Sequence, residues 1–214
     1  MSYKTAIFDL DGTLLNTLED LWHSTNLALV HYGWDVRTED EVRRFVGNGT
    51  KVLLDHAIPG GVNNPKFDEA MAYYEKMYGI HQFDNTQPYP GISEALKQLA
   101  DSGVKMAIVS NKPDFAVKDL NKKFFGLPIA CGDKKLQNRK PAPDVVFAAM
   151  KELGADPAST VYVGDSEVDV ATAQNAGLPC ISVTWGFRGK DWLISHGAET
   201  FANRPEDLVQ LIRD

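Results

Sequence analysis

The sequence is poor in cysteine, in basic relative to acidic side chains, and in long apolar runs. Its two cysteines, Cys131 and Cys180, lie far apart and form no Cys-x-x-Cys pair, which argues against a disulfide framework and a cysteine zinc site. The five histidines lack the paired spacing of metal ligands. No apolar run reaches the length of a membrane span and no secretory signal pattern is present, so we expect a cytoplasmic protein without a membrane partner.

The formal net charge of −7 argues against a nucleic-acid partner. An anionic small molecule stays compatible with this charge, because its binding depends on the local surroundings. The basic side chains that do cluster are Lys134, Lys135, Arg139 and Lys140, which we interpret as a solvated loop, with the exception of Lys140. The apolar patterns do not distinguish interface patches from core stripes, and they therefore predict no oligomeric state.

Near-continuous apolar runs alternate with helical patterns over most of the 214 residues. This alternation predicts an α/β protein with a doubly wound parallel sheet that helices cover on both faces. The predicted strands are residues 5–8, 105–109, 128–131, 160–163 and 180–183. Only helical patterns occur between the first two, which predicts an all-helical domain at 16–85, inserted into a core domain made of 1–15 and 86–214.

The first predicted strand ends in two closely spaced carboxylates, Asp9 and Asp11, followed by Gly12. With the two-residue period of a strand, both carboxylates leave on the same side, and glycine allows the tight turn beside them. Like charges held this close require a cation or a proton. An EF-hand calcium loop also opens with Asp-x-Asp, but here Leu14 replaces its glycine and Asp20 its final glutamate.

Polar side chains also follow the other predicted strands. Binding residues gather at the carboxyl ends of strands in open parallel sheets, so these groups are expected at one edge. They are Ser110, Asn111 and Lys112 after the second strand, Gly164, Asp165, Ser166 and Asp169 after the fourth, and Lys140-Pro141 in a loop. Each has a simpler interpretation, as a helix cap, a first-turn carboxylate or a surface lysine. Together they supply what phosphoryl transfer needs: metal-binding carboxylates, phosphate-binding donors and a fixed ammonium.

These clusters resemble the four motifs of the haloacid dehalogenase superfamily of phosphohydrolases, in that family's order and over nearly the full chain. The matching segments are Asp9-x-Asp11-Gly12-Thr13-Leu14, Ser110-Asn111, Lys140-Pro141 and Gly164-Asp165-Ser166-x-x-Asp169. The resemblance implies a Rossmann-like core with strand order 5-4-1-2-3, and it makes the helical insertion the family's cap. Asn16 stands where the family often carries Asp, which bears on the hinge between the domains.

The resemblance implies catalysis through an aspartyl-phosphate. Asp9 would attack phosphorus, and Asp11 would protonate the leaving alkoxide and then take a proton from the attacking water. A Mg²⁺ ion would be held by the Asp9 carboxylate, the Asp11 backbone carbonyl and Asp165. Ser166 and Asp169 would orient these ligands. The phosphoryl oxygens would be bound by Gly12, Thr13, Ser110, Asn111 and Lys140.

Within the helical insertion, Arg44-Phe45-Val46-Gly47-Asn48-Gly49 is similar to the substrate-loop sequence of phosphoglycolate phosphatases. This makes Arg44 a candidate for bidentate contact with a substrate carboxylate, against the alternative of an ordinary exposed helix charge. We therefore expect a Mg-dependent phosphatase of a small anionic phosphomonoester, with 2-phosphoglycolate ahead of sugar phosphates, nucleotides and pyrophosphate. A sugar phosphomutase on the same scaffold and a receiver-like phospho-switch are the alternatives.

Overall fold

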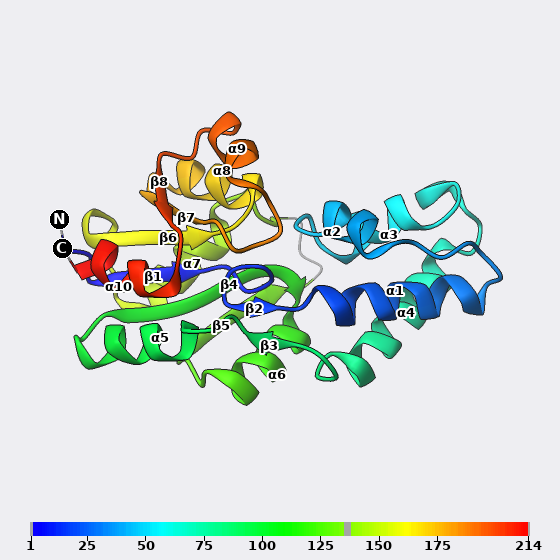
Figure 1. Ribbon diagram of the computed structural model, residues 1–214, viewed down its shortest axis with the longest axis horizontal. Coiled ribbons are helices and arrows are strands. Elements are labelled where there is room, and N and C mark those ends of the chain that lie inside the picture. The colour runs from blue at the N-terminus through cyan, green and yellow to red at the C-terminus, as the bar shows by residue number, and fades with distance from the viewer. Residues whose placement is uncertain (1, 135–137, 214) are drawn as a thin grey trace. The chain divides into compact units, whose positions relative to one another are not determined.

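The computed structural model describes residues 2–134 and 138–213, and the chain divides into two compact units (Figure 1). The α/β unit comprises Met1–Leu15 and Pro88–Asp214, and the helical unit comprises Asn16–Gln87. The divisions expected from the sequence were after residues 15 and 85. Lys135 of the predicted basic loop lies outside the described residues.

The α/β unit contains a six-stranded sheet in the order β5-β4-β1-β6-β7-β8. All neighbouring strands are parallel. The strands are β1 (Thr5–Phe8), β4 (Lys105–Pro113), β5 (Ile129–Asp133), β6 (Thr160–Gly164), β7 (Cys180–Val183) and β8 (Thr200–Ala202). The expected order 5-4-1-2-3 corresponds to β7-β6-β1-β4-β5 in these labels. The edge strand β8 was not predicted, because three residues are too few to give a periodic apolar pattern.

Helices cover both faces of this sheet (Figure 1). Every residue of β1 is buried, and since successive side chains of a strand point to opposite faces, both faces must be covered. On one face, Ile7, Ala107 and Tyr162 pack in a core cluster with Val146 and Ala173. The helices of the unit are α5 (Ile92–Asp101), α6 (Asp114–Phe124), α7 (Asp144–Leu153), α8 (Glu167–Ala176), α9 (Lys190–Ser195) and α10 (Pro205–Arg213), with a 3-10 turn η2 (Pro157–Ser159).

The helical unit is built on the packing of its two long helices, α1 against α4. Its elements are α1 (Leu18–His31), α2 (Glu39–Phe45), α3 (Thr50–Ala57), the 3-10 turn η1 (Gly61–Asn63) and α4 (Phe67–His81). Two short strands, β2 (Leu15–Asn16) and β3 (Gln87–Pro88), pair with each other where the chain passes from one unit to the other. Among the described residues, no helix has both the length and the apolar character needed to cross a membrane.

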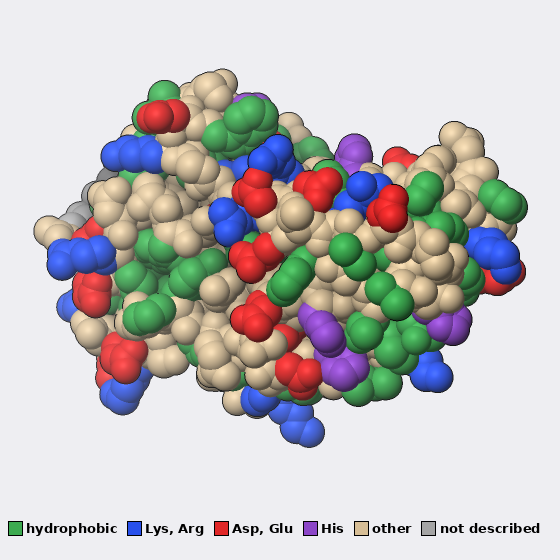
Figure 2. All heavy atoms as spheres, turned by 45° about the vertical axis from the view of Figure 1, so that its right-hand side comes forward, with side chains coloured by type: hydrophobic (Ala, Val, Ile, Leu, Met, Phe, Trp, Pro, Cys, Tyr) green, Lys and Arg blue, Asp and Glu red, His purple; other side chains and the backbone are tan. Residues whose placement is uncertain are grey.

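The surface charge is mixed in sign and partly paired within single helices. Figure 2 shows acidic and basic side chains interspersed over one face. Arg43 pairs with Glu39 on α2, and Lys97 pairs with Asp101 on α5, each one helical turn apart and exposed to solvent. Exposed pairs of this kind contribute little to stability.

Candidate active site

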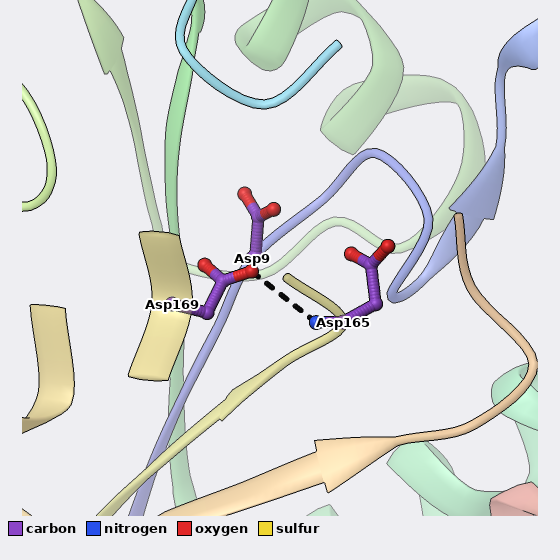
Figure 3. Close-up of side chains that lie close together, drawn as sticks. All are labelled: Asp9, Asp165 and Asp169. Atoms are coloured by element: carbon purple, nitrogen blue, oxygen red, sulfur yellow. Dashed lines mark hydrogen bonds between the residues drawn. The ribbon is translucent and has the colours of Figure 1, made fainter. Parts of the chain in front are cut away.

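Three buried carboxylates converge at the carboxyl end of the central strands. Asp9 follows β1, Asp165 follows β6, and Asp169 lies in the first turn of α8. Figure 3 shows the three side chains pointing to the same side of the sheet. Ligand oxygens from all three lie within 4.8 Å of one another. Like charges at this separation repel strongly in a buried setting, so the cluster needs compensating positive charge.

Lys140 supplies part of that compensation. Its ammonium lies 2.9 Å from Oδ1 of Asp9 and 2.8 Å from Oδ1 of Asp169, and it also donates to the hydroxyl of Tyr162 at 2.9 Å. Burial alone would lower the pKa of Lys140, but Asp169 and Asp9 raise it well above its ordinary value. One ammonium against three carboxylates leaves an excess of negative charge, which is the electrostatic setting of a divalent cation site.

Burial raises the pKa values of two of these carboxylates, Asp9 and Asp165. Burial raises the pKa of Asp9 to about 7, with the charges of Asp169 and Asp11 adding to the effect and Lys140 opposing it. Burial also raises the pKa of Asp165 well above its usual range, helped by Asp169 and Asp9 and opposed by hydrogen bonds from Phe187 and Thr13. Burial therefore disfavours the anionic form of both groups, and additional positive charge near them would favour it.

Asp169 organises the cluster from its centre. Its Oδ1 accepts from Lys140 at 2.8 Å and from Tyr162 at 3.1 Å. Its Oδ2 accepts from the backbone N–H groups of Asp165 (3.2 Å) and Ser166 (3.1 Å) and from the Ser166 hydroxyl (2.6 Å). Ser166 and Asp169 also form the capping box at the start of α8. The same contacts therefore cap helix α8 and orient Asp165. Because the lone pairs of Asp169 are occupied by these hydrogen bonds, direct binding of a metal ion by Asp169 is disfavoured.

Each carboxylate oxygen of Asp165 accepts one hydrogen bond and keeps a lone pair that could bind a metal ion. Its Oδ1 accepts from the hydroxyl of Thr13 at 3.0 Å, and its Oδ2 accepts from the backbone N–H of Phe187 at 2.8 Å. Two glycines make room for it: a Cβ on Gly12 would lie 2.4 Å from Oδ2, and a Cβ on Gly186 would lie 2.2 Å from its Cβ. Gly12 also adopts a positive φ of 84°, which favours glycine.

The donors of Gly12 and Thr13 have partners within the protein, and the expected role of these two residues in phosphate binding stays a prediction. The hydroxyl of Thr13 donates to Asp165, and its backbone N–H donates to Leu10 at 3.3 Å, so both of its donors are engaged. The N–H of Gly12 donates to Leu15 at 2.8 Å. The tight turn after β1 directs the two backbone N–H groups to Leu10 and Leu15, and of the three donors only the Thr13 hydroxyl contacts Asp165. We propose that this hydroxyl orients Asp165.

The side chain of Asn111 fixes the loop that carries Lys140. Its Nδ2 donates to the backbone carbonyl of Lys140 at 3.0 Å, and its Oδ1 accepts from the Lys140 N–H at 2.9 Å. Asn111 and Ser110 belong to the last part of β4, which continues past the predicted strand end with a register shift after Val109. Ser110, Asn111 and Lys140 together line one side of a cavity of about 750 Å³.

Arg44 lies in the other unit. It belongs to α2, its side chain is 71% exposed, and it forms an ion pair with Asp40 on the same helix. The simple interpretation, an exposed helix charge, accounts for this pair. The predicted contact of Arg44 with a substrate carboxylate stays a proposal.

Three sets of contacts in the site were not predicted, although Lys112 itself was expected at this edge of the sheet. Lys112 donates from its ammonium to Oδ1 of Asp11 at 2.8 Å. Tyr162 bridges Lys140 and Asp169, and the loop after β7 supplies both the N–H of Phe187 and an indole N–H of Trp185, which donates to the Thr13 carbonyl at 3.0 Å. A signal existed for that loop, because it follows a predicted strand at the same sheet edge. The remaining two required knowledge of which side chains meet across the sheet.

The donor set fits a hard divalent cation. Oδ1 of Asp9 is buried, and the ammonium of Lys140 lies 2.9 Å from it. A carboxylate oxygen has more than one lone pair, so this contact leaves Asp9 able to bind a metal ion. Asp9 and Asp165 together offer the carboxylate oxygens that Mg²⁺ and similar ions prefer. The free lone pairs of these two side chains make them the candidate ligands.

Comparison with known proteins adds independent support. Residues 6–183 match a model of the haloacid dehalogenase-like hydrolase family. A phosphoglycolate phosphatase of Pseudomonas putida is 31% identical, over 98% of this chain and 77% of the relative. A phosphoglycolate phosphatase of Thiobacillus denitrificans is 34% identical, over 87% of this chain and 86% of the relative. A crystal structure of a predicted phosphoglycolate phosphatase from Haemophilus somnus superposes with a TM-score of 0.91 at 26% identity, covering 100% of this chain and 99% of the other. A crystal structure of a Lactobacillus delbrueckii subsp. bulgaricus protein, provisionally assigned as a phosphoglycolate phosphatase, superposes with a TM-score of 0.93 at 34% identity. It covers 100% of this chain and 99% of the other.

Proposed function

We propose a function from one premise: this chain belongs to the haloacid dehalogenase-like hydrolases. It is a phosphatase of small phosphomonoesters, and we infer 2-phosphoglycolate as its substrate from relatives that are named phosphoglycolate phosphatases. The observation that carries this proposal is the buried cluster of Asp9, Asp165 and Asp169 with Lys140 at its side. A cluster with excess negative charge suits a metal-assisted reaction on a phosphate group.

In the first step, a carboxylate oxygen of Asp9 attacks phosphorus and forms an acyl-phosphate bond. The ester P–O bond breaks at the same centre, and Asp11 transfers a proton to the departing alkoxide. Lys140, only 2.9 Å from Asp9, provides a fixed positive charge beside the phosphoryl group. Ser110 and the Asn111 backbone amide are the further phosphate-binding groups that we propose.

In the second step, water attacks the phosphorus of the aspartyl-phosphate. The bond to Asp9 breaks and regenerates its carboxylate, while Asp11 takes a proton from the water. Inorganic phosphate and the alcohol are the products. Asp11 thus gives a proton in the first step and takes one in the second. It must therefore be held in one place through both steps.

Mg²⁺ is the proposed cofactor. The residues that would hold it are Asp9 and Asp165 through their carboxylates and Asp11 through its backbone carbonyl. When bound, the ion would supply the positive charge that the phosphoryl oxygens and the clustered carboxylates require. Thr13, Asp169 and the backbone N–H of Phe187 keep the ligands in orientation.

We further propose that the helical unit acts as a cap and that Arg44 selects substrates with a carboxylate. Its support is chemical: an exposed guanidinium matches a carboxylate bidentately. Arg43 offers a matched control on the same helix, because it is 42% exposed and pairs with Glu39. Arg44→Ala is expected to raise KM for 2-phosphoglycolate about tenfold and to leave p-nitrophenyl phosphate unchanged. Unchanged selectivity, or an equal effect of Arg43→Ala, would remove Arg44 from substrate recognition.

The decisive test of the overall function is phosphate release by the purified protein with Mg²⁺ on a panel of phosphate esters. Asp9→Asn should abolish turnover, since no nucleophilic carboxylate remains. Asp101→Asn, an exposed aspartate paired with Lys97 on α5, is the matched control. Turnover retained by Asp9→Asn would exclude the aspartyl-phosphate mechanism. Conversion of a sugar phosphate to its isomer with little free phosphate would instead identify a mutase.

A further inference from the structure

Lys112 forms a buried ion pair with Asp11 that no step of the proposed reaction yet uses. The ammonium lies 2.8 Å from Oδ1 of Asp11, with 2% of the lysine side chain and 12% of the aspartate side chain exposed. The pair of Lys118 and Asp114, in the following helix, is equally short at 2.6 Å, but its lysine is 57% exposed. The burial of Lys112 is what distinguishes the two pairs.

Burying a lysine is costly, and stability alone is a weak reason to do so. Removing an ammonium from water carries a desolvation penalty that a single partner rarely outweighs, and apolar replacements of buried pairs are often neutral or stabilising. The pair also adds a second positive charge beside a cluster that Lys140 already serves. The two lysines have different partners: Lys140 contacts Asp9 and Asp169, whereas Lys112 contacts Asp11.

The backbone around Lys112 is built to hold it in place. The register of β4 against β5 shifts between Val109 and Pro113, so the strand departs from regular pairing where Lys112 occurs. Gly132 of β5 packs closely there, since a Cβ on it would lie 2.6 Å from the Lys112 carbonyl. The Lys112 N–H donates to the hydroxyl of Ser110 at 3.3 Å. The close contact with Gly132 and the hydrogen bond to Ser110 thus restrain the backbone of Lys112, whose side chain extends to Asp11.

We propose that Lys112 is a positioning residue that holds Asp11 in the orientation needed for its proton transfers. This inference rests on the proposed phosphatase function. In this proposal the ammonium holds Oδ1 of Asp11, and Oδ2 carries the proton that is transferred. In the first step the ester P–O bond breaks, the Asp9–phosphorus bond forms, and the proton on Oδ2 passes to the alkoxide. In the second step water gives its proton back to Oδ2 as its oxygen bonds to phosphorus and the Asp9–phosphorus bond breaks.

The test compares two esters that differ in their need for a proton. The alkoxide of glycolate needs protonation as it leaves, whereas p-nitrophenolate is a weak base and leaves without it. The ratio kcat/KM reports the first step alone, because that step commits the phosphoryl group to Asp9. Lys112→Met should lower kcat/KM on 2-phosphoglycolate about 100-fold and on p-nitrophenyl phosphate less than about fivefold. Lys112→Arg should restore a large part of the loss on 2-phosphoglycolate.

Three further outcomes are informative. Equal losses on both esters would overturn the proposal, since they would indicate a role in phosphate binding or in folding. Lys112→Gln keeps a donor without the charge and replaces Lys112→Met if that variant does not fold; if neither folds, Lys112 is structural and the proposal fails. Lys118→Met is the control for losing a lysine paired with aspartate, and it should leave both values unchanged. Wild-type protein that hydrolyses neither ester would contradict the proposed function itself.

Discussion

Asn111 and Lys140 are joined by a reciprocal pair of hydrogen bonds between the amide side chain of one and the backbone of the other, at 3.0 and 2.9 Å. The pair ties the end of β4 to a loop from a distant part of the chain. Through it, a residue that carries no charge determines where the buried ammonium of Lys140 is placed. The arrangement leads to the first prediction.

Asn111→Ala should impair catalysis more than it impairs folding. We expect a loss of stability of about 1–3 kcal/mol from the unsatisfied backbone groups, and a fall in kcat of about 10- to 100-fold as Lys140 loses its position. Asn121 makes the same reciprocal pair with the backbone of Leu127, at 2.9 Å each, outside the site. Asn121→Ala is therefore the matched control, with a similar loss in urea unfolding and unchanged kcat. Equal effects of both variants on kcat would contradict the prediction.

Gly186→Ala should weaken metal binding through a steric clash with Asp165. The added Cβ would meet the Asp165 Cβ at 2.2 Å and its Oδ2 at 2.5 Å, so the carboxylate must move. We expect the Mg²⁺ concentration for half-maximal activity to rise at least about tenfold. Gly189→Ala, where a Cβ meets nothing within 4 Å, is the control from the same segment. A normal Mg²⁺ requirement in Gly186→Ala would show that Asp165 is not a ligand.

Thr13→Val should separate ligand positioning from phosphate binding. Valine keeps the shape of the side chain but removes the hydroxyl that donates to Oδ1 of Asp165 at 3.0 Å. The Mg²⁺ requirement should rise about tenfold, because the ligand loses an orienting contact. Inhibition by inorganic phosphate, measured at saturating Mg²⁺, should not change. A weakened phosphate inhibition at normal Mg²⁺ dependence would instead support the expected role of Thr13 in phosphate binding.

Asp9→Asn should stabilise the metal-free protein at alkaline pH. The pKa of Asp9 is raised to about 7 by burial, with Asp169 and Asp11 adding and Lys140 opposing. The pKa of Asp9 is higher in the folded than in the unfolded protein, so the folded protein binds this proton more tightly. The stability of the wild type therefore falls as the pH rises from about 4 to about 7. The variant lacks this loss, so its advantage should grow over that window to about 4 kcal/mol.

Urea unfolding with a chelator at pH 5 and pH 8 measures this difference. Asp101→Asn, which changes an exposed aspartate, should show the same stability difference from wild type at both pH values. Added Mg²⁺ should reverse the order at pH 8, because it binds the wild-type carboxylate. An advantage of Asp9→Asn that does not depend on pH would mean that the buried charge is not its source.

The sequence by itself determined the sheet strands that carry the site and the edge where its residues gather. Short apolar runs, the two-residue period and the turn at Gly12 are local properties, and parallel strands bring their carboxyl ends together whatever the details of packing. The convergence of Asp9 and Asp165 follows from those local rules, whereas Lys140 lies in a loop and was expected at the site only from the family resemblance. The edge strand β8 escaped them because three residues carry too little pattern.

Tertiary structure alone decided which partner each polar group takes. Thr13 turns to Asp165, the Asn111 side chain turns to the Lys140 backbone, and two similar lysines divide between Asp9 and Asp11. Hydrogen bonds and buried ion pairs depend on ångström-scale distances and on direction, and these are set by packing between segments far apart in the chain. The local pattern brought the right chemical groups to one edge of the sheet, and packing across the sheet assigned each of them its contact.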